Sequence, residues 1–226
     1  MNGRREGKDQ ITMNGEVLEN VTSFKYLGSI ITSGGDSEKE IQARINAAKS
    51  CMGRLKIIWK SKDISMKTKI RLYRSLVLSV LCYGCESWTL STEQERRLHA
   101  FDMKSLRKIL NIPWHAYKTN EYVMRPTEDL AGPVEPAIIT IKRRKLQWFG
   151  HIVRHQSLAK TILQGWVSGA RKVGRQRTMW CDNVQSWTGK TLEEAVRSAE
   201  SRWKWRRMIK SSVKLPDGPR RGPRDE

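Results

Sequence analysis

Basic residues alternate with tryptophan in the second half of the chain, and this mixture is suited to binding nucleic acid. The pattern occurs in Lys142–Trp148, Arg171–Trp180 and Arg202–Arg207. Cations bind phosphates regardless of base sequence, while aromatic rings and guanidinium planes stack on unpaired bases. The alternative is that the tryptophans form a core and the cations a solvated face. We expect most of the tryptophans in the core and the cations at phosphates, which favours nucleic acid over lipid.

Other chemistry has weaker support. Cys82 and Cys85 have the spacing of half a zinc site and His151 and His155 that of another half, but the gap between the pairs is far longer than in a zinc finger. Zinc is therefore the minor alternative, and a buried thiol at the end of an apolar helix is the favoured interpretation.

Motifs of a serine hydrolase or a phosphate-binding loop are missing from the sequence, so we expect no catalytic residue in it.

Composition points to the same class of partner. The chain has 226 residues with 43 Lys and Arg against 23 Asp and Glu, a formal charge of +20, and 38% hydrophobic residues. Such a surplus favours polyanions. The longest apolar run, Leu76–Cys82, is far below the about 20 residues of a membrane span. The N-terminus lacks the apolar segment of a secretory signal and four cysteines make no disulfide scaffold. We expect reduced thiols and a nuclear or cytoplasmic, non-secreted protein that does not insert into a membrane.

The residues that could bind nucleic acid must be positioned by a mainly helical fold that follows a short β region. Asn14-Gly15 predicts a type I′ hairpin turn, and Phe24–Ile31 predicts a further strand or strand pair. A capping box at Ser37–Glu40 then predicts a helix over Ile41–Leu55, with Arg44, Lys49 and Arg54 on its polar face.

Helical periods continue along the chain. We expect a buried helix from Ser65 to Gly84, an amphipathic helix from Thr92 towards Pro113, and a linker between Pro113 and Pro136. A fourth helix follows, in which apolar stripes surround the basic run Lys142–Lys145. Beyond it we expect a loop over Gly165–Gly174, a short helix over Thr178–Thr188, a last helix from Thr191 to about Ile209, and a disordered tail over Pro216–Glu226. The predicted regions are 1–35 (β remnant), 36–112 (first helical domain), 113–135 (linker), 136–210 (basic, tryptophan-rich helical region) and 211–226 (tail).

A series of motifs extends through most of the chain. It consists of Asn14–Glu16, Phe24–Gly28, the helix Ile41–Leu55, Tyr83-Gly84-x-Glu86-x-Trp88, Leu106-Arg107-x-Ile109-Leu110 and Arg144–His151. In order and spacing, from about residue 10 to 210, the series resembles the C-terminal part of reverse transcriptases encoded by non-LTR (LINE-type) retrotransposons. The resemblance implies that Phe24–Gly28 lies at the edge of the polymerase palm, 41–110 in the helical thumb that holds the template–primer duplex, and Lys142–His151 in a distal nucleic-acid-binding segment.

The sequence departs from that family at the catalytic centre. The family's Tyr-x-Asp-Asp motif comes before the matched region, and this sequence contains no Asp-Asp pair. Neither is there a Cys-Cys-His-Cys knuckle around Cys181, nor an endonuclease domain. The resemblance implies a fragment of an RNA-directed DNA polymerase that keeps template–primer binding but lacks catalysis, and that has no cofactor of its own, Mg²⁺ belonging to the parent enzyme. The alternative is a host-adopted, non-enzymatic interaction module. A third possibility is complementation of a palm carried by a separate chain.

The expected partners are RNA, DNA or an RNA–DNA hybrid. The resemblance implies that the strands of residues 1–35 normally extend the palm sheet, so without that sheet we expect them to expose an edge and part of an apolar face and to fold marginally or aggregate. The candidate contact residues are Lys25, Tyr26, Arg44, Lys49, Arg54, Lys142, Arg143, Arg144, Lys145, Trp148, Arg175, Arg177, Arg206 and Arg207.

Overall fold

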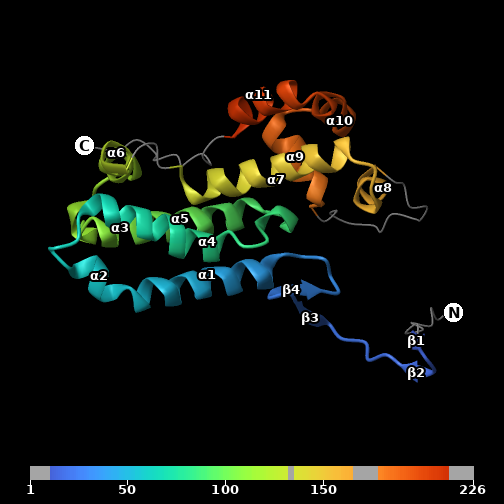
Figure 1. Ribbon diagram of the computed structural model, residues 1–226, viewed down its shortest axis with the longest axis horizontal. Helices are drawn as coiled ribbons and strands as arrows, with labels where there is room; N and C mark the ends of the chain where they lie inside the picture. The colour runs from blue at the N-terminus through green and yellow to red at the C-terminus, as the bar shows by residue number, and fades with distance from the viewer. Residues whose placement is uncertain (1–10, 132–134, 165–177, 214–226) are drawn as a thin grey trace, which may run out of the picture.

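The computed structural model describes residues 11–131, 135–164 and 178–213. Two small hairpins precede a body of packed helices, in which α1, α5 and α7 lie in successive layers below α10 and α11 (Figure 1). The predicted fold class, mainly helical after a small N-terminal β region, is confirmed. Among the described residues, no helix combines the length and apolar character needed to cross a lipid bilayer.

The elements follow one another in this order. The strands are β1 (Thr12–Met13), β2 (Glu16–Val17), β3 (Ser23–Tyr26) and β4 (Ser29–Thr32). The helices before residue 120 are α1 (Glu38–Arg54), α2 (Lys56–Lys60), α3 (Met66–Leu72), α4 (Ser79–Leu81) and α5 (Thr92–Ile109). The later helices are α6 (Asn120–Ala131), α7 (Ala137–Arg154), α8 (Leu158–Gln164), α9 (Trp180–Thr188), α10 (Leu192–Glu200) and α11 (Arg202–Ser212). A π-helical segment, Tyr73–Leu78, joins α3 to α4, and 3-10 turns occur at Cys85–Ser87 and Trp114–Ala116.

The N-terminal hairpins form as the sequence predicts. Asn14 and Gly15 both have positive φ, 53° and 83°, which a type I′ turn requires, and β1 pairs with β2 across them. Leu27 and Gly28 also have positive φ, 47° and 81°, and form the turn between β3 and β4. The hydroxyl of Tyr83 donates a hydrogen bond to the carbonyl of Leu27 (2.9 Å), which holds this second turn against the helices.

The start of α1 differs from the predicted capping box. The Ser37 hydroxyl makes no cap and instead accepts the amide of Thr89 (3.0 Å). Glu40 accepts the amide of Ile30 (2.6 Å) and pairs with Arg44 (2.6 Å). The two side chains expected to cap the N-terminus of α1 therefore bond to β4 and to the segment before α5. These contacts join residues that are distant in the sequence, so the local sequence does not encode them.

Two hydrophobic cores meet along α7. The first is built from α1, α3, α4 and α5 with the N-terminal half of α7, and the second from the rest of α7 with α9, α10 and α11. At the centre of the first core, buried Asp102 accepts the Tyr73 hydroxyl and the amide of Ala137, each at 2.7 Å. Burial raises the pKa of Asp102. Because Ala137 is the first residue of α7, this carboxyl fixes where α7 starts on the bundle.

Two expectations about secondary structure were wrong. The predicted linker 113–135 contains helix α6, whose Val123 is buried in the first core. The predicted last helix is two helices, because Ser201 leaves the helical region (φ −89°, ψ 111°) and caps α11. Helix α8 was not predicted. The predicted loop Gly165–Gly174 and the predicted disordered tail Pro216–Glu226 lie outside the described residues.

Candidate nucleic-acid interface

The basic run of α7 is divided between two faces of the helix. Lys145 continues the apolar stripe of Ile138, Ile141 and Phe149 at steps of three and four, so it turns inward. Arg144 begins a different stripe, which continues through Trp148, His151 and His155 at steps of four, three and four. Side chains at these steps share one face of an α-helix, and this second stripe reaches the surface.

Lys145 lies at the junction of the two cores and is fully buried. Its ammonium nitrogen donates to the carbonyl of Trp88 (2.7 Å) and to Oδ1 of Asn183 (2.8 Å), and it lies 4.5 Å from the ring centre of Trp180. Burial lowers the pKa of Lys145 to about 7, although nearby acidic groups, of which Asp182 is one, act in the opposite direction. No phosphate reaches this nitrogen in the packed structure.

Lys142 is also internal. Its ammonium pairs with Glu95 of α5 at 2.8 Å, with both side chains about nine-tenths buried. The other carboxylate oxygen of Glu95 accepts the indole N–H of Trp187 (2.9 Å). The predicted phosphate contacts Lys142 and Lys145 thus have internal partners, which come from α5, α9 and the segment before α5.

Arg143 faces a hollow between α7 and α11. This cavity, of about 210 Å³, is lined by Arg143, Gln147, Arg206 and Lys210 together with Glu135 and apolar side chains. Arg143 pairs with Glu135, which also accepts the hydroxyl of Thr140 (2.9 Å). Neither Arg206 nor Lys210 has a carboxylate within 4.0 Å among the residues that the structure describes.

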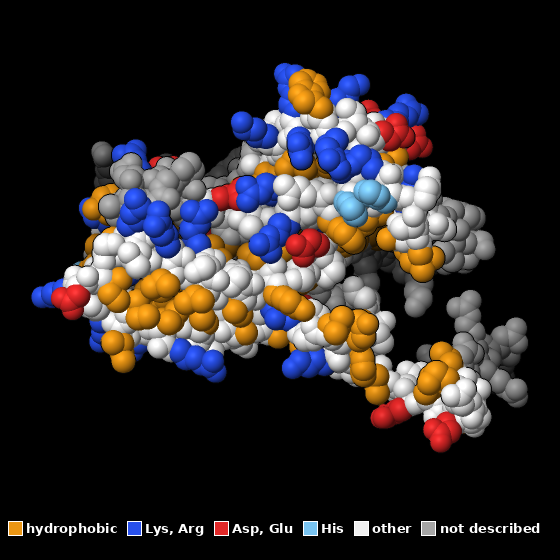
Figure 2. Space-filling model, in the orientation of Figure 1, with side chains coloured by type: hydrophobic (Ala, Val, Ile, Leu, Met, Phe, Trp, Pro, Cys, Tyr) orange, Lys and Arg blue, Asp and Glu red, His pale blue; other side chains and the backbone are white. Residues whose placement is uncertain are grey.

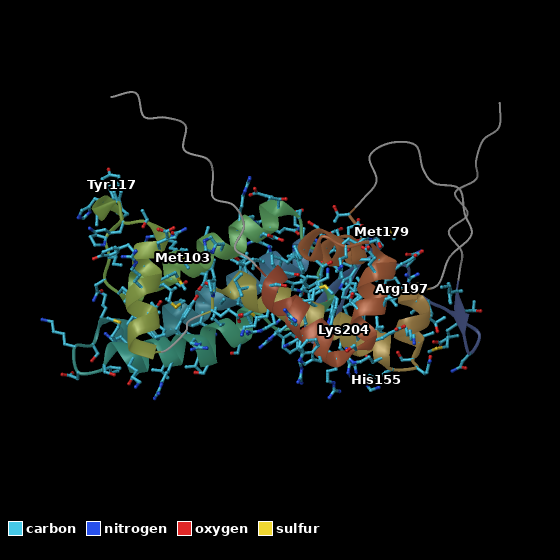
Figure 3. The ribbon with its side chains drawn as sticks, turned by 90° about the horizontal axis from the view of Figure 1, so that it is seen from above. Met103, Tyr117, His155, Met179, Arg197 and Lys204 are labelled. Atoms are coloured by element: carbon cyan, nitrogen blue, oxygen red, sulfur yellow. The ribbon has the colours of Figure 1, made fainter. Side chains whose placement is uncertain are left out.

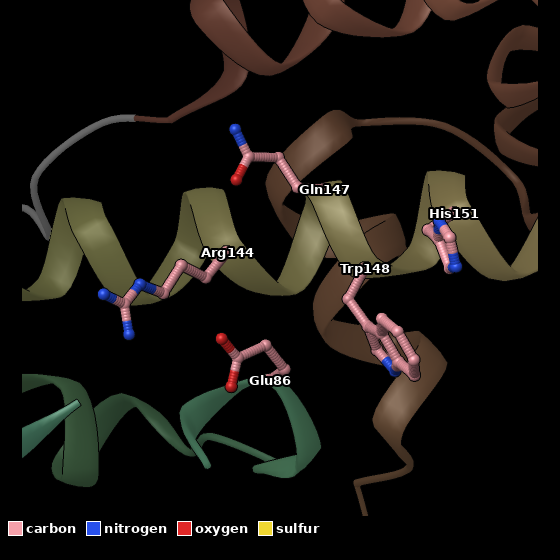
Figure 4. A pocket seen from close by; sticks show the side chains of 5 residues that line it. All are labelled: Glu86, Arg144, Gln147, Trp148 and His151. Carbon is pink, nitrogen blue, oxygen red and sulfur yellow. The ribbon is translucent and has the colours of Figure 1, made fainter. Parts of the chain in front are cut away.

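A second cavity adjoins the first across α7. It has a volume of about 430 Å³ and is lined by Glu86, Arg144, Gln147, Trp148 and His151 (Figure 4). Arg144 and Trp148 extend from α7 to the side on which Glu86 lies, the His151 ring lies over the α7 ribbon, and Gln147 points to the other side. Gln147 belongs to both linings, so the two cavities are neighbours along α7.

We call this combined surface the α7–α11 surface. Its members are Glu86, Glu135, Arg143, Arg144, Gln147, Trp148, His151, Arg206 and Lys210. On the visible face of the molecule, Lys and Arg side chains lie side by side over α11, directly beside a pair of histidines at the C-terminal part of α7 (Figure 2). Viewed from above, the labelled side chains of Lys204 and His155 lie on the same side of the molecule (Figure 3).

Aromatic rings on this surface stack along α7. The rings of Trp148 and His151 are nearly parallel, with centres 5.4 Å apart and planes at 14°. His151 and His155 follow at 4.2 Å. Trp148 is 43% exposed, so one part of its indole is available to a ligand. Arg144 is anchored by its Nη1 to the carbonyl of Cys82 (3.2 Å), which leaves its other N–H groups to face the cavity.

Helix α11 is positioned on α7 by one tryptophan and one glycine. The Trp205 indole N–H donates to the carbonyl of Leu146 (2.7 Å), and its ring packs 5.2 Å from that of Phe149. A Cβ at Gly150 would lie 2.4 Å from two atoms of the same indole, so only glycine fits there. This close approach places Arg206 and Lys210 opposite Arg143.

The other predicted contact residues lie elsewhere. Arg44 is not a free cation: it pairs with Glu40, donates to the Gly28 carbonyl and lies 4.5 Å from the Tyr83 ring centre. Exposed side chains that do not line the α7–α11 surface are Lys25, Tyr26, Lys49, Arg54 and Arg207, the last of which lies over the ring of Trp203. Arg175 and Arg177 lie outside the described residues.

Five members of the surface were not predicted as contacts: Glu86, Glu135, Gln147, His151 and Lys210. His151 could have been found from the spacing, since it follows Trp148 by three residues on the same face of α7, whereas Gln147 points to the other side. Lys210 lies one turn after Arg206 and carries the same signal. The sequence carries no signal that Glu86 belongs to this surface, because only the tertiary fold brings the turn Cys85–Ser87 beneath α7.

Metal ligands do not gather in the part of the chain that the structure describes. Residues 11–131, 135–164 and 178–213 contain no group of three or more His, Cys, Asp or Glu side chains that could hold a metal ion. The α7–α11 surface offers cations, an amide, two carboxylates and aromatic rings. Cys82 and Cys85, half of the minor zinc alternative, are buried in the first core.

Comparison with known proteins relates the chain to mobile elements. It is 27% identical over 172 residues to a transposon-derived protein of Caenorhabditis elegans, a match that covers 74% of this chain and 61% of the relative. It is 22% identical over 107 residues to the RNA-directed DNA polymerase from the mobile element jockey of Drosophila funebris, covering 46% of this chain and 12% of the relative. The chain thus spans less than two thirds of either curated relative. No protein-family model and no solved structure matches it. These similarities support a transposon-derived origin related to retrotransposons.

Proposed function

We propose that this chain binds nucleic acid through the α7–α11 surface, as the template–primer-binding portion of a retrotransposon-type RNA-directed DNA polymerase. The observation that carries the proposal is the arrangement of Arg143, Arg206 and Lys210 around one cavity that neighbours the pocket of Arg144 and Trp148. Phosphate contacts serve single-stranded and duplex binding alike, and a stacking ring beside them adds contact with an unpaired base. The similarity to the jockey polymerase and the charge of +20 support the same proposal.

The charges on this side of the molecule repel one another. Desolvation, followed by the charges of Arg202 and Arg206, lowers the pKa of Arg154. Its Nη1 still donates to the carbonyl of Ala199 (2.8 Å), but no carboxylate among the described residues pairs with it. A phosphate backbone laid across α11 relieves this repulsion, and the release of its counterions drives binding.

The test measures affinity for an RNA–DNA hybrid as a function of salt. Fluorescence anisotropy of a labelled hybrid gives the binding constant from low to physiological salt, and we expect its logarithm to fall steeply and linearly with the logarithm of the salt concentration. The double variant Arg206→Glu and Lys210→Glu should weaken binding by more than about tenfold. The matched control is Lys104→Glu with Lys108→Glu, two exposed lysines one turn apart on α5 that line neither cavity. Salt-independent binding, or equal losses in both variants, contradicts the proposal.

Catalysis is proposed to reside elsewhere. The sequence contains no Asp-Asp pair, so we expect no primer extension by the purified chain alone. A separately expressed palm is the partner that would make the chain part of an enzyme. Primer extension by that palm, measured with and without the chain, tests this proposal, and an unchanged rate removes it.

A protein-binding module is the second candidate, favoured by the exposed apolar side chains of the hairpins. Residues 11–28 are all exposed, and the apolar side chains among them include Ile11, Val17 and Phe24 at more than half exposure. Exposed strands of this kind are suited to pairing with another sheet. If this candidate is correct, the Arg206→Glu and Lys210→Glu variant keeps all cellular interactions, while Phe24→Ser loses them.

A further inference from the structure

We propose that the pocket of Glu86, Arg144, Trp148 and His151 receives one unpaired guanine base. This inference rests on the proposed nucleic-acid function and adds a base preference to it. The phosphate contacts of the α7–α11 surface lack any means of reading sequence, whereas this pocket combines a stacking ring with a carboxylate and a guanidinium.

The stacking part of the site is already arranged. Trp148 lies against His151 with nearly parallel planes, and His151 continues to His155. This column supports the indole from one side and leaves its remaining surface in the cavity, where Trp148 is 43% exposed. A base that stacks there continues a column of aromatic rings and gains contact without ordering a mobile side chain. Because bases in a duplex are already stacked on each other, only an unpaired base can use it.

Glu86 indicates that the pocket binds a base edge and not a phosphate. Its carboxylate faces the cavity between Arg144 and Trp148 (Figure 4) and has no ion-pair partner within 4.0 Å among the described residues. A carboxylate repels phosphate, so its presence beside the most basic part of the surface is unfavourable for backbone binding. It is suited to accept N–H groups of a base.

Guanine is the base whose edge fits this pair of side chains. Its Watson–Crick edge carries the O6 acceptor followed by two donors, N1–H and the N2 amino group. Arg144 donates to O6, and the neighbouring Glu86 accepts from N1–H and N2–H. Adenine presents a donor in place of O6 and an acceptor in place of N1–H, so it opposes both side chains. Cytosine and uracil offer fewer matched groups and a smaller stacking area.

The experiment compares short single-stranded uridine oligomers that carry one central guanine, adenine or uridine, with anisotropy as the readout on the full chain. We expect the guanine oligomer to bind about tenfold tighter than the adenine oligomer. Glu86→Gln should bring this ratio close to one. Trp148→Ala should weaken all three oligomers, the guanine one by about tenfold, and Trp148→Phe should retain most of the affinity.

Two controls separate this inference from the proposed function. Trp114→Ala removes a tryptophan that is 82% exposed and far along the chain from α7, and it should leave every affinity unchanged. Arg206→Glu with Lys210→Glu should weaken all oligomers without changing the guanine-to-adenine ratio. Salt-dependent binding with equal affinities for guanine and adenine, or a Trp148→Ala variant that binds as the unaltered chain does, overturns the guanine site alone. Absence of binding to any oligomer and to the hybrid at low salt overturns both proposals.

Discussion

Arg144 and Lys145 are consecutive residues, yet they belong to opposite sides of α7. Lys145 is enclosed by the Trp88 carbonyl, Asn183 and Trp180, and it joins the two hydrophobic cores. Arg144 keeps one anchor on the Cys82 carbonyl and otherwise faces an open cavity. The difference teaches that a cation in a basic run has a structural role where other elements surround it with oxygen acceptors. Where such acceptors are missing, its N–H groups remain available to a ligand.

The largest effect is expected from removing the buried cation. Lys145→Ala leaves the Trp88 carbonyl without its buried donor and creates a cavity between the cores, so the free energy of unfolding should fall by about 3 kcal/mol. Urea denaturation followed by circular dichroism measures it. Arg143→Ala, two positions earlier and half-exposed, is the control and should cost less than about 1 kcal/mol. Equal losses in the two variants would remove the distinction between the faces.

The second effect concerns pH. The folded-state pKa of Lys145 is about 7, below the ordinary value of 10.5 that applies to the unfolded chain. Between these values the unfolded state binds more protons, so the contribution of Lys145 to the free energy of unfolding rises with pH, by at most about 1.4 kcal/mol per pH unit. Below pH 7 its contribution is constant. Unfolding of Lys145→Met at several pH values should lack this rise, and identical slopes in both chains would contradict the assignment.

A smaller effect is expected at the surface. Arg143→Ala should reduce the salt slope of hybrid binding by about one and weaken affinity about fivefold, because one phosphate contact is lost. Lys142→Ala should instead lower stability, since it leaves Glu95 buried without its cation, and should leave the salt slope of the folded protein unchanged. Titrations of both variants at several salt concentrations give the comparison. A reduced slope in Lys142→Ala would place that lysine on the binding side.

The smallest effect is expected at Arg44, a predicted nucleic-acid contact whose side chain instead joins α1 to the β3–β4 hairpin. Arg44→Ala removes its pairing with Glu40 and its bond to the Gly28 carbonyl, so the β3–β4 hairpin should open more often. Hydrogen exchange at the Ile30 amide, which Glu40 binds, should accelerate by a few-fold, with hybrid binding unchanged. Lys49→Ala, an exposed position on the same helix, should leave this exchange as it is.

Regular elements were the predictable part of the fold. The apolar periods predicted α1, α5 and α7, and Asn14-Gly15 predicted the first hairpin. Each of these elements depends on residues that are close together in the chain. Helix α6 was missed because Pro126 and the absence of a clear apolar period suggested a linker, although burial of Val123 against the first core stabilises a helix there. The break at Ser201 was missed because the helical pattern continues through it.

The candidate site was predictable as a region but not residue by residue. The run Lys142–Lys145 and Trp148 drew attention to α7, the helix that lines both cavities. Which cations are buried depends on Glu95 and Asn183, which lie about 40 residues or more away in sequence and carry no local signal. The one available indication was that Lys145 falls on the apolar stripe of Ile138 and Ile141, a position from which a long side chain turns inward.

The contact of Trp205 with Gly150 also determines how the two cationic helices behave as a pair. The indole fills the space above the glycine, so α11 cannot slide along α7 or tilt without displacing a buried ring. The packing of α11 on α7 thereby fixes the distance from Arg143 to Arg206 before any ligand binds. Under the proposed function, a bound polynucleotide adapts its own curvature to that spacing, and the protein loses little conformational entropy on binding.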